Sequence, residues 1–155
     1  MPETATPFTT HRFAVHIRVP GLEREVCDAS FSECDGLEMT LETKTIREGG
    51  NNGQQIHVIG PVSYGRLTLK RGMTERADLW AWFEKLLETG RQGLRADALV
   101  TVLGSDRDGR PRVDARYVLT RCLPVKLKVP SLSAREGGVA IEEMQIAYES
   151  LRMKA

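Results

Sequence analysis

The chain has 155 residues, enough for one domain with a hydrophobic core of ordinary size. Apolar residues make up 41% of the chain and charged residues 28%, which excludes disordered and fibrous proteins. Lysine and arginine number 22 against 21 acidic residues, so the formal net charge is +1. This balance is atypical of proteins whose main partner is nucleic acid, because phosphate binding needs a net basic face.

The ends and the apolar runs of the chain carry no targeting signal. No apolar stretch approaches the roughly 20 residues that a membrane helix needs, so we expect no direct membrane anchor. Residues 1–7 lack a basic region followed by an apolar run, which favours cytoplasmic synthesis without a signal peptide. We interpret residues 1–10 as a flexible N-terminal arm on a single domain that spans 1–155.

Alternation of apolar and polar residues predicts strands in the first half of the chain. The first predicted strand spans residues 12–19 and ends at Pro20-Gly21. A second, with one apolar and one charged face, spans 37–45. The polar loop that follows, 47–55, contains three glycines, and a third strand is expected within 62–70.

One convincing helix follows these strands. It begins at Thr74, a good N-cap residue, and ends at Gly90. Leu79, Phe83 and Leu86 recur at helical spacing and form one wide apolar face. A helix docked on a sheet requires such a face, so we expect these three side chains to be buried.

Strands resume in the second half of the chain. They are predicted at 98–103, at 113–119 and at 125–129, with a turn rich in Asp and Gly between the first two. The last strand begins near Gly138. Its apolar residues change parity along the strand, which a β-bulge at Glu142-Glu143 would produce.

These elements amount to six or seven strands and one helix, with no internal repeat or linker. We therefore predict a mainly β fold, an antiparallel β-sandwich or barrel with one packed α-helix.

The sequence offers only weak candidates for catalytic groups. The three histidines lie far apart in the sequence, and no Gly-x-Ser-x-Gly motif marks a nucleophile. The segment Asp106 to Gly109 lacks the further ligands of a calcium loop and is interpreted as a solvated turn. Cys27, Cys34 and Cys122 lack metal-ligand spacing and are expected to be buried, reduced thiols. We therefore expect no catalytic residue, no metal site and no cofactor, so the protein is not an enzyme.

Two polar features leave a choice open. Charged residues on the outward strand faces form either a solvated sheet face or the lining of a wet channel in a large barrel. The candidate lumen-facing residues for such a channel are Glu38, Glu42, Lys44, Glu143, Gln145 and Glu149. The glycine-rich loop lacks the ending of a phosphate-binding loop, and composition alone allows a mobile linker or a contact arm.

Five segments resemble, in order, the phage-type tail tube proteins. They are Phe31 to Glu38, Arg47 to Asn51, Leu67 to Thr74 with the helix start Leu79 to Trp82 behind it, Leu123 to Lys126, and Val139 to Glu142. Each segment alone is weak, but their order and spacing make a specific signal over nearly the whole chain. This family includes the inner tubes of contractile phage tails and of extracellular contractile injection systems and, more distantly, those of type VI secretion.

The resemblance implies a structural subunit of the inner tube of a contractile, phage-tail-like injection system. Subunits of such a tube form hexameric rings in which four strands of each copy join one large β-barrel around a cargo-conducting lumen, and the rings stack. The implied partners are further copies of the chain, the sheath protein, baseplate or tube-initiator and terminator proteins, and a cargo effector in the lumen. The implied inter-ring contact loop comprises Arg47, Glu48, Gly49, Gly50, Asn51, Asn52 and Gly53. No nucleic acid binding is expected of the isolated subunit.

Two alternatives remain at this point. The chain could instead form the tube-initiator ring or a baseplate adaptor of the same machine, because residues 55–65 depart from the family pattern. A monomeric ligand-binding β-barrel belongs to another class and predicts an apolar interior cavity with a solvated outside.

Overall fold

The computed structural model describes residues 12–22, 31–47, 49–50, 53–72, 77–89, 94–135, 137–138 and 140–154. Within these ranges the elements follow the order β1 (Arg12–Arg18), β2 (Glu33–Asp35), β3 (Met39–Ile46), β4 (Ile56–Tyr64), β5 (Arg66–Gly72), α1 (Asp78–Thr89), β6 (Ala96–Ser105), β7 (Pro111–Lys128), β8 (Ile141–Ala147) and β9 (Ser150–Lys154). The strands pair antiparallel, and the predicted mainly β fold with one helix is confirmed. The predicted arm, 1–10, lies outside the described residues.

The long strand β7 belongs to two sheets. Its first part lies between β6 and β9, and its last part, from Leu123 onward, pairs with β8. One sheet therefore has the order β1-β6-β7-β9 and the other the order β7-β8-β5-β2. Arg121 has a positive φ of 53°, and the register shifts between Pro124 and Lys126. These irregularities let one strand cross between sheets where two separate strands, 113–119 and 125–129, were predicted.

Side chains that point inward from both sheets form one hydrophobic core. The following strand residues of this core are each at most 2% exposed: Val15, Ile17, Leu67, Leu69, Ala98, Val100, Leu119, Met144 and Ile146. They occupy every second position of their strands, which is the alternation that predicted half-buried strands.

Helix α1 covers this core with a set of side chains that differs from the predicted one. Leu79 is buried as expected, but the second deeply buried side chain is Trp82, which is fully buried. Phe83 and Leu86 are only half-buried. Helical spacing allows any of these residues on the apolar face, and the helix's rotation against the sheet selects among them.

Several element boundaries differ from the predicted ones. The expected N-cap Thr74 and stop Gly90 lie outside the described residues, and the helix as described begins at Asp78. The short strands β2 and β9 were not predicted as separate elements. No helix in the described ranges is long and apolar enough to cross a membrane.

The bulge predicted at Glu142-Glu143 is wrong. β8 pairs with β5 without a register shift along its whole length. Glu142 itself occupies a core position and is 5% exposed, while Ile141 turns outward and is 47% exposed. A carboxylate lies inside because the residue opposite it is Arg71, which is also buried and forms an ion pair with it.

Arg71 joins three elements at this buried position. Its guanidinium donates to Glu142 on β8 and to both carboxylate oxygens of Asp78, the first residue of α1. Its central carbon also lies 5.8 Å from the ring centroid of Phe31, at cation–π distance. The cluster therefore fastens the start of the helix to the sheet.

The turn between β6 and β7 is a polar turn, as predicted. The N–H of Gly109, whose φ is 78°, donates to the carbonyl of Asp106 at 3.1 Å. The Asp106 carboxylate accepts from the N–H groups of Asp108 and Arg110 at 3.0 and 2.7 Å. This carboxylate therefore stabilises the turn itself.

Candidate assembly interface

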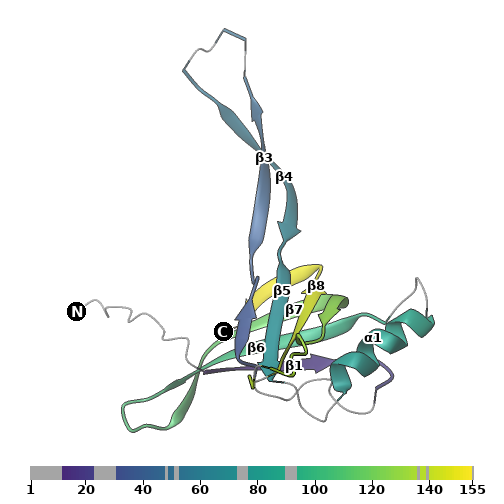
Figure 1. Ribbon diagram of the computed structural model, residues 1–155. Helices are drawn as coiled ribbons and strands as arrows, with labels where there is room; N and C mark the ends of the chain where they lie inside the picture. Colours follow the sequence, from purple (N-terminus) through teal and green to yellow (C-terminus); the bar gives the residue numbers. More distant parts are fainter. Residues whose placement is uncertain are drawn as a thin grey trace.

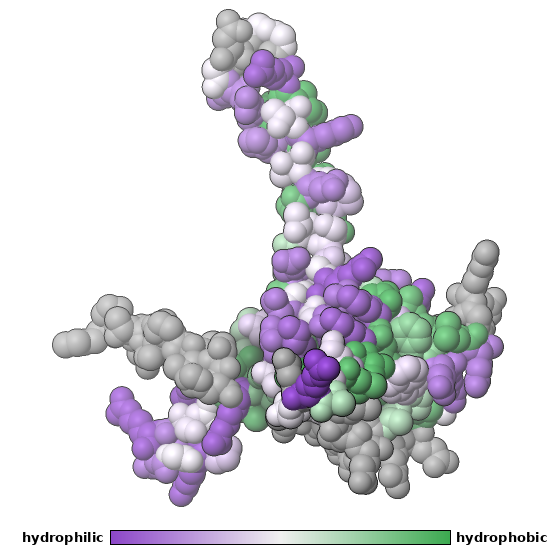
Figure 2. Space-filling model, in the orientation of Figure 1, coloured by the Kyte–Doolittle hydropathy of each residue, from purple (hydrophilic) through white to green (hydrophobic). Residues whose placement is uncertain are grey.

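Strands β3 and β4 form a separate two-stranded sheet, a hairpin that stands out from the body of the protein (Figure 1). Its large apolar side chains are each at least 42% exposed to solvent. They are Met39, Leu41, Ile46, Ile56, Val58, Ile59 and Val62. Figure 2 shows apolar patches between polar ones along this stem. An isolated two-stranded hairpin is marginally stable in water, and exposed apolar patches mark interaction sites. The hairpin is therefore suited to packing against another chain.

The sequence predicted this region only in part. The alternation over 37–45 marks a real strand, but β3 is exposed along its whole length and neither face meets the core. The strand predicted within 62–70 covers the end of β4 and most of β5, whereas the part of β4 before Val62, which contains Gly60-Pro61, was not predicted. Its enrichment in β-branched residues between Ile56 and Val62 is the signal that could have revealed it.

A β-bulge in the middle of the hairpin explains the Gly60-Pro61 pair. The register shifts between Leu41 and Thr43, so that both residues of the pair oppose Glu42. A Cβ atom at Gly60 would lie 2.7 Å from the backbone oxygen of Glu42, which leaves room only for glycine. Proline is tolerated at such a bulge because the ladder is already interrupted there.

Tyr148 fastens the base of the hairpin to the body. Its hydroxyl donates to the carbonyl of Gly36 at 2.7 Å and accepts the N–H of Glu38 at 3.1 Å. Its ring centroid lies 5.6 Å from that of Tyr64, the last residue of β4. Burial raises the pKa of the Tyr148 phenol, which therefore remains a proton donor at neutral pH.

Tyr148→Phe is expected to loosen the hairpin base. The change leaves the Gly36 carbonyl and the Glu38 N–H without their shared partner, which costs about 1–3 kcal/mol of unfolding free energy. Urea denaturation measures the loss, and hydrogen exchange at the Glu38 amide should become faster. The control is Tyr117→Phe, since no hydrogen bond within the described residues involves that hydroxyl. Equal losses in the two variants would contradict the anchoring role.

The predicted inter-ring loop lies at the outer end of the hairpin (Figure 1). The loop residues that the structure describes are all exposed to solvent. They are Arg47, Gly49, Gly50 and Gly53. Among the described residues, chain neighbours aside, no atom lies within 4 Å of a Cβ atom built at any of the three glycines, and Gly50 has a φ of 103°. The other predicted loop residues, Glu48, Asn51 and Asn52, lie outside the described residues.

The structure does not bring the six candidate lumen-facing residues together. Glu42 and Lys44 lie on β3, and Glu38 lies at the hairpin base. Glu143 and Gln145 are half-buried on β8. Glu149 is exposed and pairs with Arg121 at 2.5 Å. Their position in a lumen stays a prediction.

Two of the three cysteines are described, and both are free thiols. Cys122 is buried and Cys34 half-buried, and burial raises their pKa values to about 12 and about 11. Both are therefore protonated and poorly nucleophilic at neutral pH. Cys27 lies outside the described residues. Within the described ranges, no group of three His, Cys, Asp or Glu side chains could hold a metal ion.

A two-sheet body with one covering helix and a long apolar hairpin defines a structural protein of the tail-tube type. The chain belongs to the family described as T4-like virus tail tube protein gp19, whose sequence profile matches residues 9–152. The resemblance carried by the five sequence segments is thus confirmed. The chain is a structural component of phage-tail-like particles and not an enzyme, and nothing supports the alternative of a monomeric ligand-binding barrel.

Solved structures of contractile injection systems share the fold. A chain in the cryo-EM structure of the anti-feeding prophage (AFP) baseplate, 6-fold symmetrised, is 27% identical, with a TM-score of 0.81 over 98% of both chains. A chain in the PVC sheath-tube complex in the extended state is 19% identical, with a TM-score of 0.77 over 96% of this chain and 92% of that one. A search of curated proteins finds no match.

Proposed function

We propose that the protein forms hexameric rings that stack into the inner tube of a contractile injection system and enclose a cargo-conducting lumen. The observation that carries this proposal is the β3–β4 hairpin, whose apolar side chains are exposed along both strands. A neighbouring subunit would cover them. The 27% identical relative in a 6-fold symmetrised baseplate supports the hexameric state.

The β1-β6-β7-β9 sheet is the part of the subunit best suited to joining its neighbours within a ring. Its edge strands β1, with seven residues, and β9, with five, each pair on one side only within the described residues. The other sheet ends in β2, with three residues, and in the last part of β7, which carries Lys126 and Lys128. Short strands and lysines protect edges from pairing. Pairing of β1 with the β9 strand of the next copy would continue the ladder into a closed barrel.

The proposal extends to partners outside the ring. The sheath protein would surround the tube, a baseplate or tube-initiator ring and a terminator would meet its two ends, and a cargo effector would occupy the lumen. Related chains come from structures of a baseplate, a sheath-tube complex and a sheath/tube terminator, which supports this arrangement. Cytoplasmic synthesis and the single-domain organisation stay predictions.

Gly49→Val/Gly50→Val is expected to block the stacking of rings while leaving the fold and the single ring intact. The two glycines are exposed at the hairpin end, and branched side chains there would prevent close approach of another ring. Negative-stain images should show tubes for the unmodified chain, alone or on a baseplate template, and single rings for the variant. Circular dichroism checks the fold.

The control for this experiment is Gly109→Val in the β6–β7 turn. Like Gly50, Gly109 has a positive φ and, among the described residues other than its chain neighbours, no atom within 4 Å of its Cβ position, so the local strain is similar. This variant should form tubes of normal length. Normal tubes from Gly49→Val/Gly50→Val would exclude the loop as the axial contact. A chain that stays monomeric even on a template would refute the proposed function.

One observation favours a second location, the tube-initiator ring at the baseplate. The relative from the AFP baseplate structure is 27% identical, whereas the relative from the PVC sheath-tube complex is 19% identical. An initiator should form single rings that nucleate tubes of a different tube protein. A main tube subunit should instead extend its own rings without limit, so tube length in the purified protein separates the two.

A further inference from the structure

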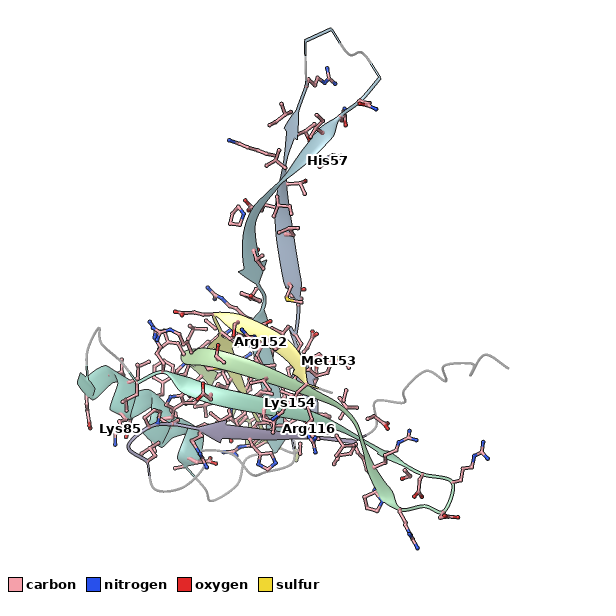
Figure 3. The ribbon with its side chains drawn as sticks, turned by 180° about the vertical axis from the view of Figure 1, so that it is seen from behind. His57, Lys85, Arg116, Arg152, Met153 and Lys154 are labelled. Atoms are coloured by element: carbon pink, nitrogen blue, oxygen red, sulfur yellow. The ribbon has the colours of Figure 1, made fainter. Side chains whose placement is uncertain are left out.

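The outer face of the β1-β6-β7-β9 sheet carries a group of cations that the sequence analysis did not single out. The register places Arg116 of β7 directly opposite Lys154 of β9, and the next outward pair is Val118 and Arg152. Figure 3 shows Arg116, Arg152 and Lys154 on these two neighbouring strands. Arg18 of β1 belongs to the same face by register. We call these four residues the basic face.

A shallow depression of about 410 Å³ lies on this face. Arg18, Arg116 and Lys154 line it, with Leu99 and Val118 between them. Asp97 is the one carboxylate among its described lining residues. The depression therefore combines several positive charges with a small apolar floor.

Arg18 lies opposite Asp97 on β6, but the other three cations of the basic face have no carboxylate directly opposite them on a neighbouring strand in the described ranges. Arg116 and Lys154 lie directly opposite each other, and like charges in this position destabilise an antiparallel sheet. Within the described residues, no ion pair involves Arg116, Arg152 or Lys154. The arrangement weakens the isolated fold and is consistent with an anionic partner.

The outer face of the other sheet provides an internal comparison. Its cross-strand row runs from Glu33 through Lys70 and Glu143 to Lys128, so the charge changes sign at every strand. Lys70 and Glu33 form an ion pair at 3.4 Å. This face neutralises itself, and the net charge of the whole chain is only +1. Positive charge is thus concentrated on the basic face.

We propose that the basic face is a docking surface for an acidic polypeptide. Its placement rests on the proposed tube, in which the β1-β6-β7-β9 sheet closes the barrel. The inward face of that sheet is buried in the core of the subunit, so its outer face would line the lumen. In this arrangement Glu143 and Gln145, which lie on β8 of the other sheet, would not face the lumen. The acidic polypeptide would then be cargo held by the tube.

The observations favour a polypeptide over a nucleic acid. Single-stranded nucleic acids are bound by several aromatic side chains on which successive bases stack. Among the described residues that line the depression, the only aromatic ring is the imidazole of His16, and there is no Phe, Tyr or Trp. Leu99 and Val118 instead offer aliphatic contacts between the charges, which suit an acidic peptide that also carries apolar side chains.

The test measures binding of fluorescently labelled poly-L-glutamate to the full chain by fluorescence anisotropy at low ionic strength. Arg116→Gln/Lys154→Gln should weaken binding about tenfold or more, because it removes two charges from the basic face. Lys126→Gln/Lys128→Gln is the matched control, since it removes the same charge from the outer face of the other sheet. The control should change the affinity less than about twofold. Circular dichroism confirms that both variants fold.

Each result supports or overturns the proposal. Equal weakening by the two double variants would show a response to net charge alone and would overturn it. Tighter binding of an oligodeoxynucleotide of matched charge would assign the face to nucleic acid instead. Negative-stain images of the same samples test the tube separately. If rings form but poly-L-glutamate does not bind, the docking proposal is refuted and the tube is not. If Arg116→Gln/Lys154→Gln abolishes binding in a chain that never forms rings, the tube is refuted and the docking surface is not.

Discussion

Gly36→Ala should disrupt the junction between the hairpin and the body. Gly36 has a φ of 93°, and a Cβ atom there would lie 1.8 Å from the carbonyl oxygen of Arg66. The unfavourable backbone conformation costs about 1–3 kcal/mol, and overpacking against a fixed carbonyl adds about 1–3 kcal/mol. The carbonyl of Gly36 also accepts the Tyr148 hydrogen bond, so the hairpin base should loosen and tube formation should fail.

Gly50→Ala separates the two contributions to this loss. Gly50 has a similar φ of 103°, but in the described part of the chain no atom beyond its sequence neighbours lies within 4 Å of its Cβ position. Its variant should show only the conformational cost, about 1–3 kcal/mol. Urea denaturation of both variants measures the difference, which reports the steric clash at the hairpin base. If the two variants lose equal stability, the close contact with Arg66 is not important.

Arg71→Met should destabilise the protein by about 3–5 kcal/mol, because removing one partner of a buried ion pair leaves the other charge uncompensated. Glu142, 5% exposed, would keep its charge in the core without its cationic partner, and Asp78 would lose its bidentate contact. The start of α1 should detach from the sheet. Thermal and urea denaturation measure the loss of stability.

Two further variants test whether buried charge is the cause. Arg121→Met removes a similar side chain from an exposed ion pair with Glu149, whose partners are 60% and 52% exposed, and should cost at most about 1 kcal/mol. Arg71→Met/Glu142→Leu removes both buried charges and should recover much of the lost stability. A double variant as unstable as Arg71→Met would instead assign the loss to packing around Phe31.

Local patterns were sufficient for the strands that face the core. In β1, and in β5 as far as Leu69, every second residue is apolar, as a strand with one buried face requires. The five family-like segments led to the correct family because their order along the chain is itself sequence information. Both inferences depend only on residues close in sequence or on their order.

The same alternation in β3 predicted a strand but not what surrounds it. The pattern indicates that one face of the strand is apolar. It does not indicate whether that face packs against the core of the same chain or against a neighbouring subunit. Only the structure shows β3 paired with β4 alone, away from the core. The predicted bulge in β8 failed similarly, because Glu142 resembles a surface residue until Arg71, far away in sequence, is placed opposite it.

The sequence by itself determined the fold class, the family, the glycine-rich loop and most core strands of this protein, since these follow from local periodicity and segment order. The tertiary structure decided which surfaces are available to partners. Antiparallel register brings Arg116 beside Lys154, and strand crossing by β7 separates the basic face from the charge-alternating face. Cross-strand register depends on pairings between distant segments, which local periodicity does not encode.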